Sequence, residues 1–92
     1  MTDLAVRRPQ LAVGVRLHWD SVRERHVLLF PEGALALNPT AAEVLALCDG
    51  QRTLEEISEV LSVRYDGAAV HEEVASLLDS IAERGLVVDA EV

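Results

Sequence analysis

Apolar and polar positions alternate near the start of the chain. From residue 13 to residue 19 every second residue is apolar, with small or polar residues between, and a period of two is typical of a strand with one buried face. Two further apolar runs, at residues 26–30 and 34–37, each follow a cluster of turn-forming residues. The pattern therefore predicts an antiparallel meander of three strands.

The apolar period then changes, and a first helix is predicted. Asn38 is a suitable N-cap because its side chain accepts a free backbone N–H, and Pro39 needs no N–H of its own at the first helical position. Apolar residues then recur at helical spacing until Gly50, which favours a helix stop. We expect this helix to cover residues 39–49.

Two more helices are predicted further along the chain. Thr53 and Glu56 have the spacing of a capping box, in which each side chain bonds the backbone N–H of the other residue. They predict the start of a second helix that ends near Tyr65. Apolar residues from Val70 onward repeat on one stripe until Gly85, and this predicts a third, longer helix.

The order of these elements predicts an α+β fold that is winged helix-turn-helix-like, with a three-stranded antiparallel sheet followed by three helices. A chain of 92 residues can bury one modest core, so we expect a single domain over residues 13–92. Residues 1–12 show no period, and we interpret them as a flexible N-terminal arm or an added edge segment. The apolar tail at residues 86–88 is expected to pair with the sheet or to cover part of it.

The charge distribution argues against nucleic acid as a partner. The net charge is −8, and residues 40–84 carry ten acidic residues against three arginines. In a DNA-binding winged helix the third helix enters the major groove, yet here its polar positions include Glu72, Glu73, Asp79 and Glu83. Phosphates would repel such a helix, because each phosphate contact needs a Lys or Arg. We therefore expect no nucleic-acid binding.

Catalytic and metal-binding patterns are not found in the sequence. His18, His26 and His71 form no close-spaced pair, and Cys48 has no second cysteine nearby, so we expect no metal. No nucleophile or phosphate-binding motif is present, and we expect neither an enzyme nor a cofactor. The lone Cys48 fits a buried position and a reducing compartment. With no apolar run long enough for a membrane span and no signal peptide, we expect a cytoplasmic protein that does not bind membranes.

A binding site is nevertheless predicted at the edge of the sheet. The third strand, with Gly33 before it, is short and uncharged, so its edge can accept another chain as a further strand. The small side chains of Ala34 and Ala36 would leave a groove beside the third helix, in which a peptide could bury a Leu or Ile. Alternatively, the apolar stripe of that helix is entirely internal core. The same edge also permits a homodimer by strand exchange, which would cover the groove.

Four segments of the sequence resemble one known family. They are Arg16–Asp20 (RLHWD), residues 28–33 (LLFPEG), residues 37–41 (LNPTA) and residues 47–53 (LCDGQRT). In order and spacing they are similar to the pyrroloquinoline quinone (PQQ) biosynthesis protein D family, PqqD. The resemblance runs from about residue 11 to residue 88, and Phe30 stands where Tyr is expected as often.

The resemblance implies a peptide chaperone. Members of this family bind the ribosomal precursor peptide PqqA and present it to PqqE, a radical S-adenosylmethionine enzyme that cross-links a Glu and a Tyr of the peptide. The peptide lies as an extra strand against the third strand, in a cleft walled by the third helix. By position this implies peptide-binding roles for Leu35, Ala36, Leu37, Val70, Val74, Leu77 and Ile81.

Other residues of the family motifs are candidates for contact with the partner enzyme, namely Trp19, Asp20 and Glu32. Two alternatives remain open at this stage. The chain could recognise the leader peptide of a related modified-peptide pathway, such as that of mycofactocin or of a lasso peptide. It could also be an acidic winged-helix module for protein interaction or transcription.

Overall fold

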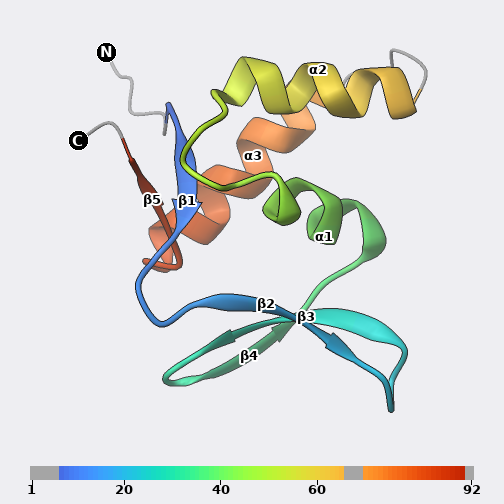
Figure 1. Cartoon of the computed structure of the whole chain (residues 1–92), viewed down its shortest axis with the longest axis vertical. Coiled ribbons are helices and arrows are strands. Elements are labelled where there is room, and N and C mark those ends of the chain that lie inside the picture. Colours follow the sequence, from blue (N-terminus) through green and yellow to red (C-terminus); the bar gives the residue numbers. More distant parts are fainter. Residues whose placement is uncertain (1–6, 66–69, 91–92) are drawn as a thin grey trace.

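The computed structural model describes residues 7–65 and 70–90. Within these residues the chain forms a three-stranded antiparallel sheet, three helices and a separate two-stranded sheet (Figure 1). The predicted α+β class, with the sheet before three helices, is confirmed. In chain order the elements are β1 (Pro9–Leu11), β2 (Arg16–Asp20), β3 (Arg25–Phe30), β4 (Gly33–Ala36), α1 (Pro39–Ala46), α2 (Leu54–Arg64), α3 (Val70–Glu83) and β5 (Val87–Asp89).

The meander has the strand order β2-β3-β4. Leu17, Leu28 and Leu35 are direct partners across its three strands. Because directly opposed residues share one face of a sheet, these three leucines form an apolar row, and all three pack in the hydrophobic core. The alternation of the sequence thus correctly places Leu17 on the buried face, whereas Trp19, also expected there, is 50% exposed.

The first predicted strand begins later than the alternation suggests. The backbone N–H of Val15 donates to the carbonyl of Ala12 at 3.0 Å, and Gly14 has a φ of +81°, so residues 12–15 form a tight turn. Val13 is 100% exposed. The extension of the strand back to residue 13 was therefore wrong, because a glycine in the left-handed region turns the chain there.

The predicted helix starts are confirmed at atomic detail. Asn38 Oδ1 accepts the N–H of Ala41 at 2.7 Å. The capping box of α2 is complete, since Thr53 Oγ1 accepts from Glu56 N at 3.1 Å and Glu56 Oε1 accepts from Thr53 N at 2.8 Å. However, α1 ends at Ala46, not at residue 49, and the chain beyond it turns toward the N-terminal strand.

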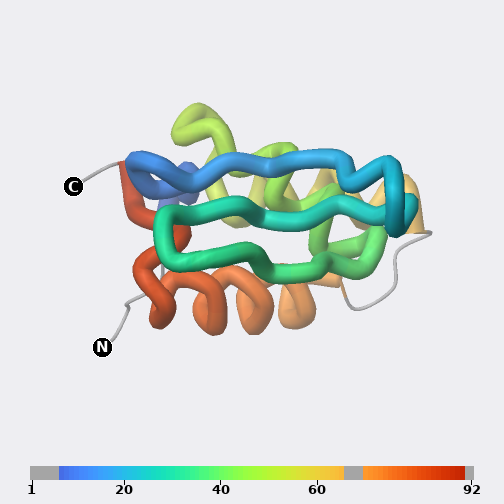
Figure 2. The backbone as a smooth tube through the Cα atoms, turned by 90° about the horizontal axis from the view of Figure 1, so that it is seen from below, coloured from blue at the N-terminus to red at the C-terminus, as the bar shows by residue number. Residues whose placement is uncertain are grey.

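The three helices lie on the same side of the three-stranded sheet, and the core fills the space between (Figures 1 and 2). Each buried Leu or Ile contributes on the order of 1.5–3 kcal/mol, so this aliphatic layer holds sheet and helices together. The most completely buried aliphatic side chains come from β3 and from all three helices, and they are Leu28, Val44, Leu45, Ile57, Leu61 and Leu78.

The N-terminal segment differs from the expectation of a flexible arm. Residues 1–6 lie outside the described residues, but β1 is paired with β5, and Pro9 is fully buried. The carbonyl of Pro9 also accepts the N–H of Gly50 at 3.0 Å, so β1 is held on both sides. The apolar tail at residues 86–88 accordingly contributes to this second sheet and does not join the meander.

Candidate binding site at an open strand edge

Both edges of the meander, β2 and β4, lack a partner strand within the described residues, and at β4 the hydrogen-bond pattern identifies the groups that the edge offers. The N–H of Leu37 donates to the carbonyl of His26 at 3.0 Å. Since bonding direction alternates along an antiparallel strand, Leu35 also faces β3, whereas Ala34 and Ala36 direct their N–H and C=O groups away from it. Across residues 7–65 and 70–90 no strand pairs with this edge.

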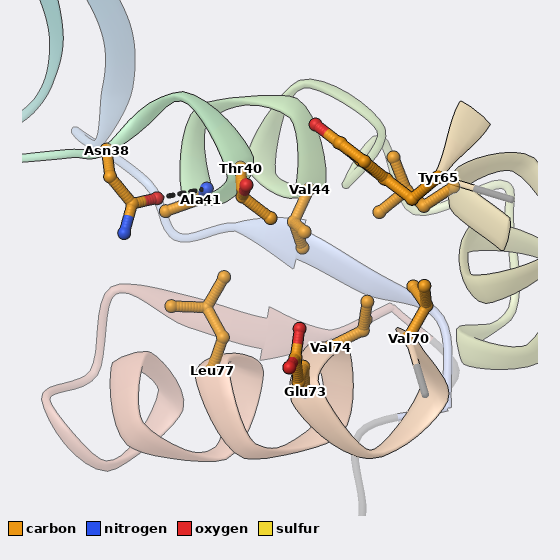
Figure 3. A pocket seen from close by; sticks show the side chains of 10 residues that line it. Asn38, Thr40, Ala41, Val44, Tyr65, Val70, Glu73, Val74 and Leu77 are labelled. Atoms are coloured by element: carbon orange, nitrogen blue, oxygen red, sulfur yellow. Dashed lines mark hydrogen bonds between the residues drawn. The ribbon is translucent and has the colours of Figure 1, made fainter. Parts of the chain in front are cut away.

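A pocket lies between α1 and α3; it includes Asn38, two residues after the end of β4, but no residue of β4 itself, and we call it the pocket beside β4. It has a volume of about 420 Å³ and is lined by side chains from α1, from the end of α2 and from α3 (Figure 3). α3 runs along the β4 side of the sheet (Figure 2), so an added strand would approach both the edge and the pocket. The lining residues are Asn38, Thr40, Ala41, Val44, Leu61, Tyr65, Val70, Glu73, Val74 and Leu77.

The structure divides the sequence-predicted peptide residues into accessible and core positions. Ala36 is exposed, and Leu35 and Leu77 are half-buried against the core. The other four are largely covered by the protein itself, with Val74 only 2% exposed, and they are Leu37, Val70, Val74 and Ile81. The apolar stripe of α3 is thus mostly core, and Leu77 is its principal accessible member beside the edge.

Val70 and Val74 still contribute their remaining surface to the pocket. Four of the seven predicted residues do not line this pocket, namely Leu35, Ala36, Leu37 and Ile81, so the structure groups only Val70, Val74 and Leu77 there.

Several lining residues were missed as site residues by sequence reasoning. Ala41 and Val44 lie on the inner stripe of α1, and that stripe predicted burial only. The sequence predicts Tyr65 only as a helix end, yet its hydroxyl donates to Glu43 Oε1 at 2.8 Å. Glu73 enters the sequence argument only as an acidic position of the third helix that disfavours nucleic acid. No spacing in the sequence indicates that these residues converge, because the pocket forms from three different helices.

The candidate enzyme-contact residues lie at two opposite ends of the meander. Trp19 is 50% exposed and meets His26 edge to face, with ring centroids 5.0 Å apart. Asp20 is engaged in the β2–β3 turn: it accepts the N–H of Arg23 and of Val22, and these bonds lower the pKa of its carboxyl despite some desolvation. Glu32 is exposed in the β3–β4 turn. The structure therefore does not bring these three residues together.

The remaining reactive groups have structural surroundings. Burial, and secondarily the charge of Asp49, raises the pKa of the Cys48 thiol to about 12, so this thiol stays protonated at neutral pH. Among residues 7–65 and 70–90, no group of three His, Cys, Asp or Glu side chains is placed to hold a metal ion. In the same ranges no helix combines the length and apolar character required to span a membrane.

These observations define a class of protein: a small winged helix-turn-helix-like domain with a free strand edge and an adjoining apolar pocket. The particular family follows from comparison with known proteins. The family model described as coenzyme PQQ synthesis protein D (PqqD) matches residues 25–87. The chain belongs to the PqqD family.

Curated relatives agree with this assignment over most of their length. A protein of Methylococcus capsulatus named "PqqA binding protein" is 37% identical over 78 residues, which span 85% of this chain and 84% of that protein. A protein of the same name from Rhodopseudomonas palustris strain TIE-1 is 40% identical over 85 residues, or 90% of this chain and 83% of that protein.

The fold is also shared with a solved structure. The solution structure of the PqqD part of Methylobacterium extorquens PqqCD has a TM-score of 0.74 and 37% identity, and the match covers 86% of each chain. That protein is described as a functional, stand-alone recognition element for ribosomally synthesised and post-translationally modified peptides. In Methylorubrum extorquens, a bifunctional coenzyme PQQ synthesis protein C/D is 38% identical over 78 residues, and the match covers 83% of this chain and 21% of that fusion protein.

Proposed function

We propose that this chain is a non-catalytic peptide chaperone of PQQ biosynthesis that binds the precursor peptide PqqA as an additional strand on β4. The observation that carries the proposal is the outward direction of the N–H and C=O groups of Ala34 and Ala36 beside an apolar pocket. The names of the curated relatives supply the identity of the peptide.

The edge and the pocket are both needed for useful affinity. A backbone hydrogen bond contributes about 0.5–1.5 kcal/mol net, while association costs roughly 4 kcal/mol or more in lost freedom of motion. The backbone hydrogen bonds of two outward-facing residues can therefore offset little more than the cost of association. Burial of one Leu or Ile side chain adds about 1.5–3 kcal/mol, and Leu77 with the pocket beside it provides the place for it.

The bound peptide is then presented to the radical S-adenosylmethionine enzyme PqqE. Within the described part of the chain no strand pairs with the opposite edge of the sheet, β2, so a peptide on β4 leaves that edge to a partner. Trp19, with half of its surface exposed on β2, is the candidate contact there. Exchange of strands between two copies would use β4, and a homodimer of that kind would compete with the peptide.

The test is a pair of substitutions at Ala36, measured by isothermal titration with a synthetic PqqA peptide. Ala36→Pro removes the outward N–H but no bond to β3, and an edge strand tolerates proline at such a position. Ala36→Val keeps the N–H and favours a strand. We expect the proline variant to bind about tenfold more weakly, since it lacks one hydrogen bond, and the valine variant to bind as the wild type does. Equal affinity of both variants would place the peptide elsewhere.

A further inference from the structure

The pocket beside β4 contains a single charged side chain, that of Glu73. The other nine lining residues are apolar or carry an uncharged polar group. Figure 3 shows Glu73 projecting from α3 toward α1, between Leu77 and Val70 along the helix. A side chain that enters the pocket from an added strand would therefore pass close to this carboxylate.

Glu73 has no counterion within the part of the chain that the structure describes, and the contrast with Glu43 makes this informative. Glu43 lies on α1, forms an ion pair with Arg64 at 3.3 Å and accepts a hydrogen bond from the hydroxyl of Tyr65. Arg84, the residue directly after α3, instead places its guanidinium carbon Cζ over the ring of Phe30, 6.0 Å from the ring centroid. Glu73 thus presents an available negative charge in the lining of an otherwise uncharged pocket.

We infer that Glu73 is a specificity-determining residue that selects a Lys or Arg in the bound peptide. This inference rests on the proposed function and extends it to the chemistry of the ligand. Alternate side chains of a strand share one face, so the basic residue lies two positions from the apolar residue that fills the pocket. Its aliphatic stem covers Leu77, and its charged end bonds the Glu73 carboxylate. An acidic residue at that position is repelled.

Glu72 provides a matched control. It is the neighbouring residue on α3 and carries the same charge, but it lines a different hollow, between α2 and α3, together with Glu55 and Ser58. Both glutamates are exposed, so Glu73→Gln and Glu72→Gln remove one negative charge each without disturbing the core. Only the first removes it from the pocket beside β4.

The experiment measures binding of overlapping synthetic PqqA fragments to three proteins: wild type, Glu73→Gln and Glu72→Gln. In the tightest fragment each Lys and Arg is replaced by Gln in turn. At one of these positions, replacement of the basic residue is expected to weaken the binding of the fragment to wild type and to Glu72→Gln by roughly fivefold. This is the effect of losing one partly exposed charge pair. The same replacement should change little in Glu73→Gln. A Glu73→Arg variant should in turn favour a fragment with Glu at that position.

The outcomes separate the two proposals. If a fragment binds the wild type but no basic residue matters, or if Glu73→Gln remains as sensitive as Glu72→Gln, the selection by Glu73 is overturned and the peptide-binding function stands. If no fragment binds the wild type, both proposals are overturned. Loss of the basic-residue effect in Glu73→Gln alone supports the inference.

Discussion

The hydroxyl of Tyr65 donates a hydrogen bond to Oε1 of Glu43 at 2.8 Å. This bond ties the end of α2 to the middle of α1, and Arg64 reinforces it with an ion pair to the same carboxylate oxygen at 3.3 Å. Since Tyr65 is also a wall of the pocket beside β4, the bond fixes the position of that wall. It thereby links the packing of two helices to the shape of the candidate site.

Replacement of Tyr65 by Phe should separate these two roles. The change removes the hydroxyl, so the free energy of unfolding should fall by about 0.5–1 kcal/mol, the usual net value of one hydrogen bond. The ring remains, and peptide affinity should change less than twofold. Urea denaturation and titration with peptide would measure the two quantities. An unchanged free energy of unfolding would mean that water replaces the tyrosine hydroxyl as the partner of Glu43 at no cost in stability.

Truncation of Leu77 should mainly reduce peptide affinity, whereas truncation of Val74 should mainly reduce stability, although both residues lie on α3. Leu77 is half-buried and borders the pocket, whereas Val74 is 2% exposed. Leu77→Ala should therefore weaken peptide binding by about 1–2 kcal/mol and cost little stability. Val74→Ala should mainly lower the free energy of unfolding, by about 1–3 kcal/mol, because it leaves a cavity in the core. A similar loss of affinity in both variants would argue for a deeper site.

Gly50 and Gly85 form a matched pair for backbone strain. Both have positive φ, +79° and +77°. A Cβ at Gly50 would lie 2.8 Å from Gln10 Oε1 and 3.2 Å from the Cβ of Ala90, whereas a Cβ at Gly85 meets nothing within 4 Å. Gly85→Ala should thus lower the free energy of unfolding by about 1 kcal/mol for strain alone, and Gly50→Ala by roughly 2–3 kcal/mol with crowding added. Equal losses would show that Gln10 and Ala90 both move aside freely.

Much of the fold could be predicted because its signals are local. The caps at Asn38 and Thr53 depend on residues three positions away, and the structure contains both as expected. The pairing of β1 with β5 could not be predicted in this way. Each strand has only three residues, too few to show a period, and the partners lie at opposite ends of the chain.

The sequence indicates less about the site than about the fold, because the site depends on contacts between distant elements. An apolar stripe on a helix indicates that a face is covered, but not whether the chain itself or a ligand covers it. On α3 the stripe is mostly core, and Leu77 is the exception. Likewise, Glu73 and Glu72 are indistinguishable in the sequence, and only the positions of α1 and α2 place one of them at the pocket beside β4.

Cys48 should make the domain sensitive to alkali. Its thiol is buried and donates to the carbonyl of Val44 at 3.3 Å, and burial raises its pKa from about 9 to about 12. Between these two pH values the folded protein retains a thiol proton that the unfolded chain loses. The free energy of unfolding is therefore at its full value below pH 9 and declines as the pH rises toward 12. The decline should approach 1.4 kcal/mol for each pH unit. Urea denaturation of the wild type and of Cys48→Ala across this range would measure it, since all other titrating groups are shared. The stability of the alanine variant should decline less steeply, and parallel curves would show that the thiol ionises without unfolding.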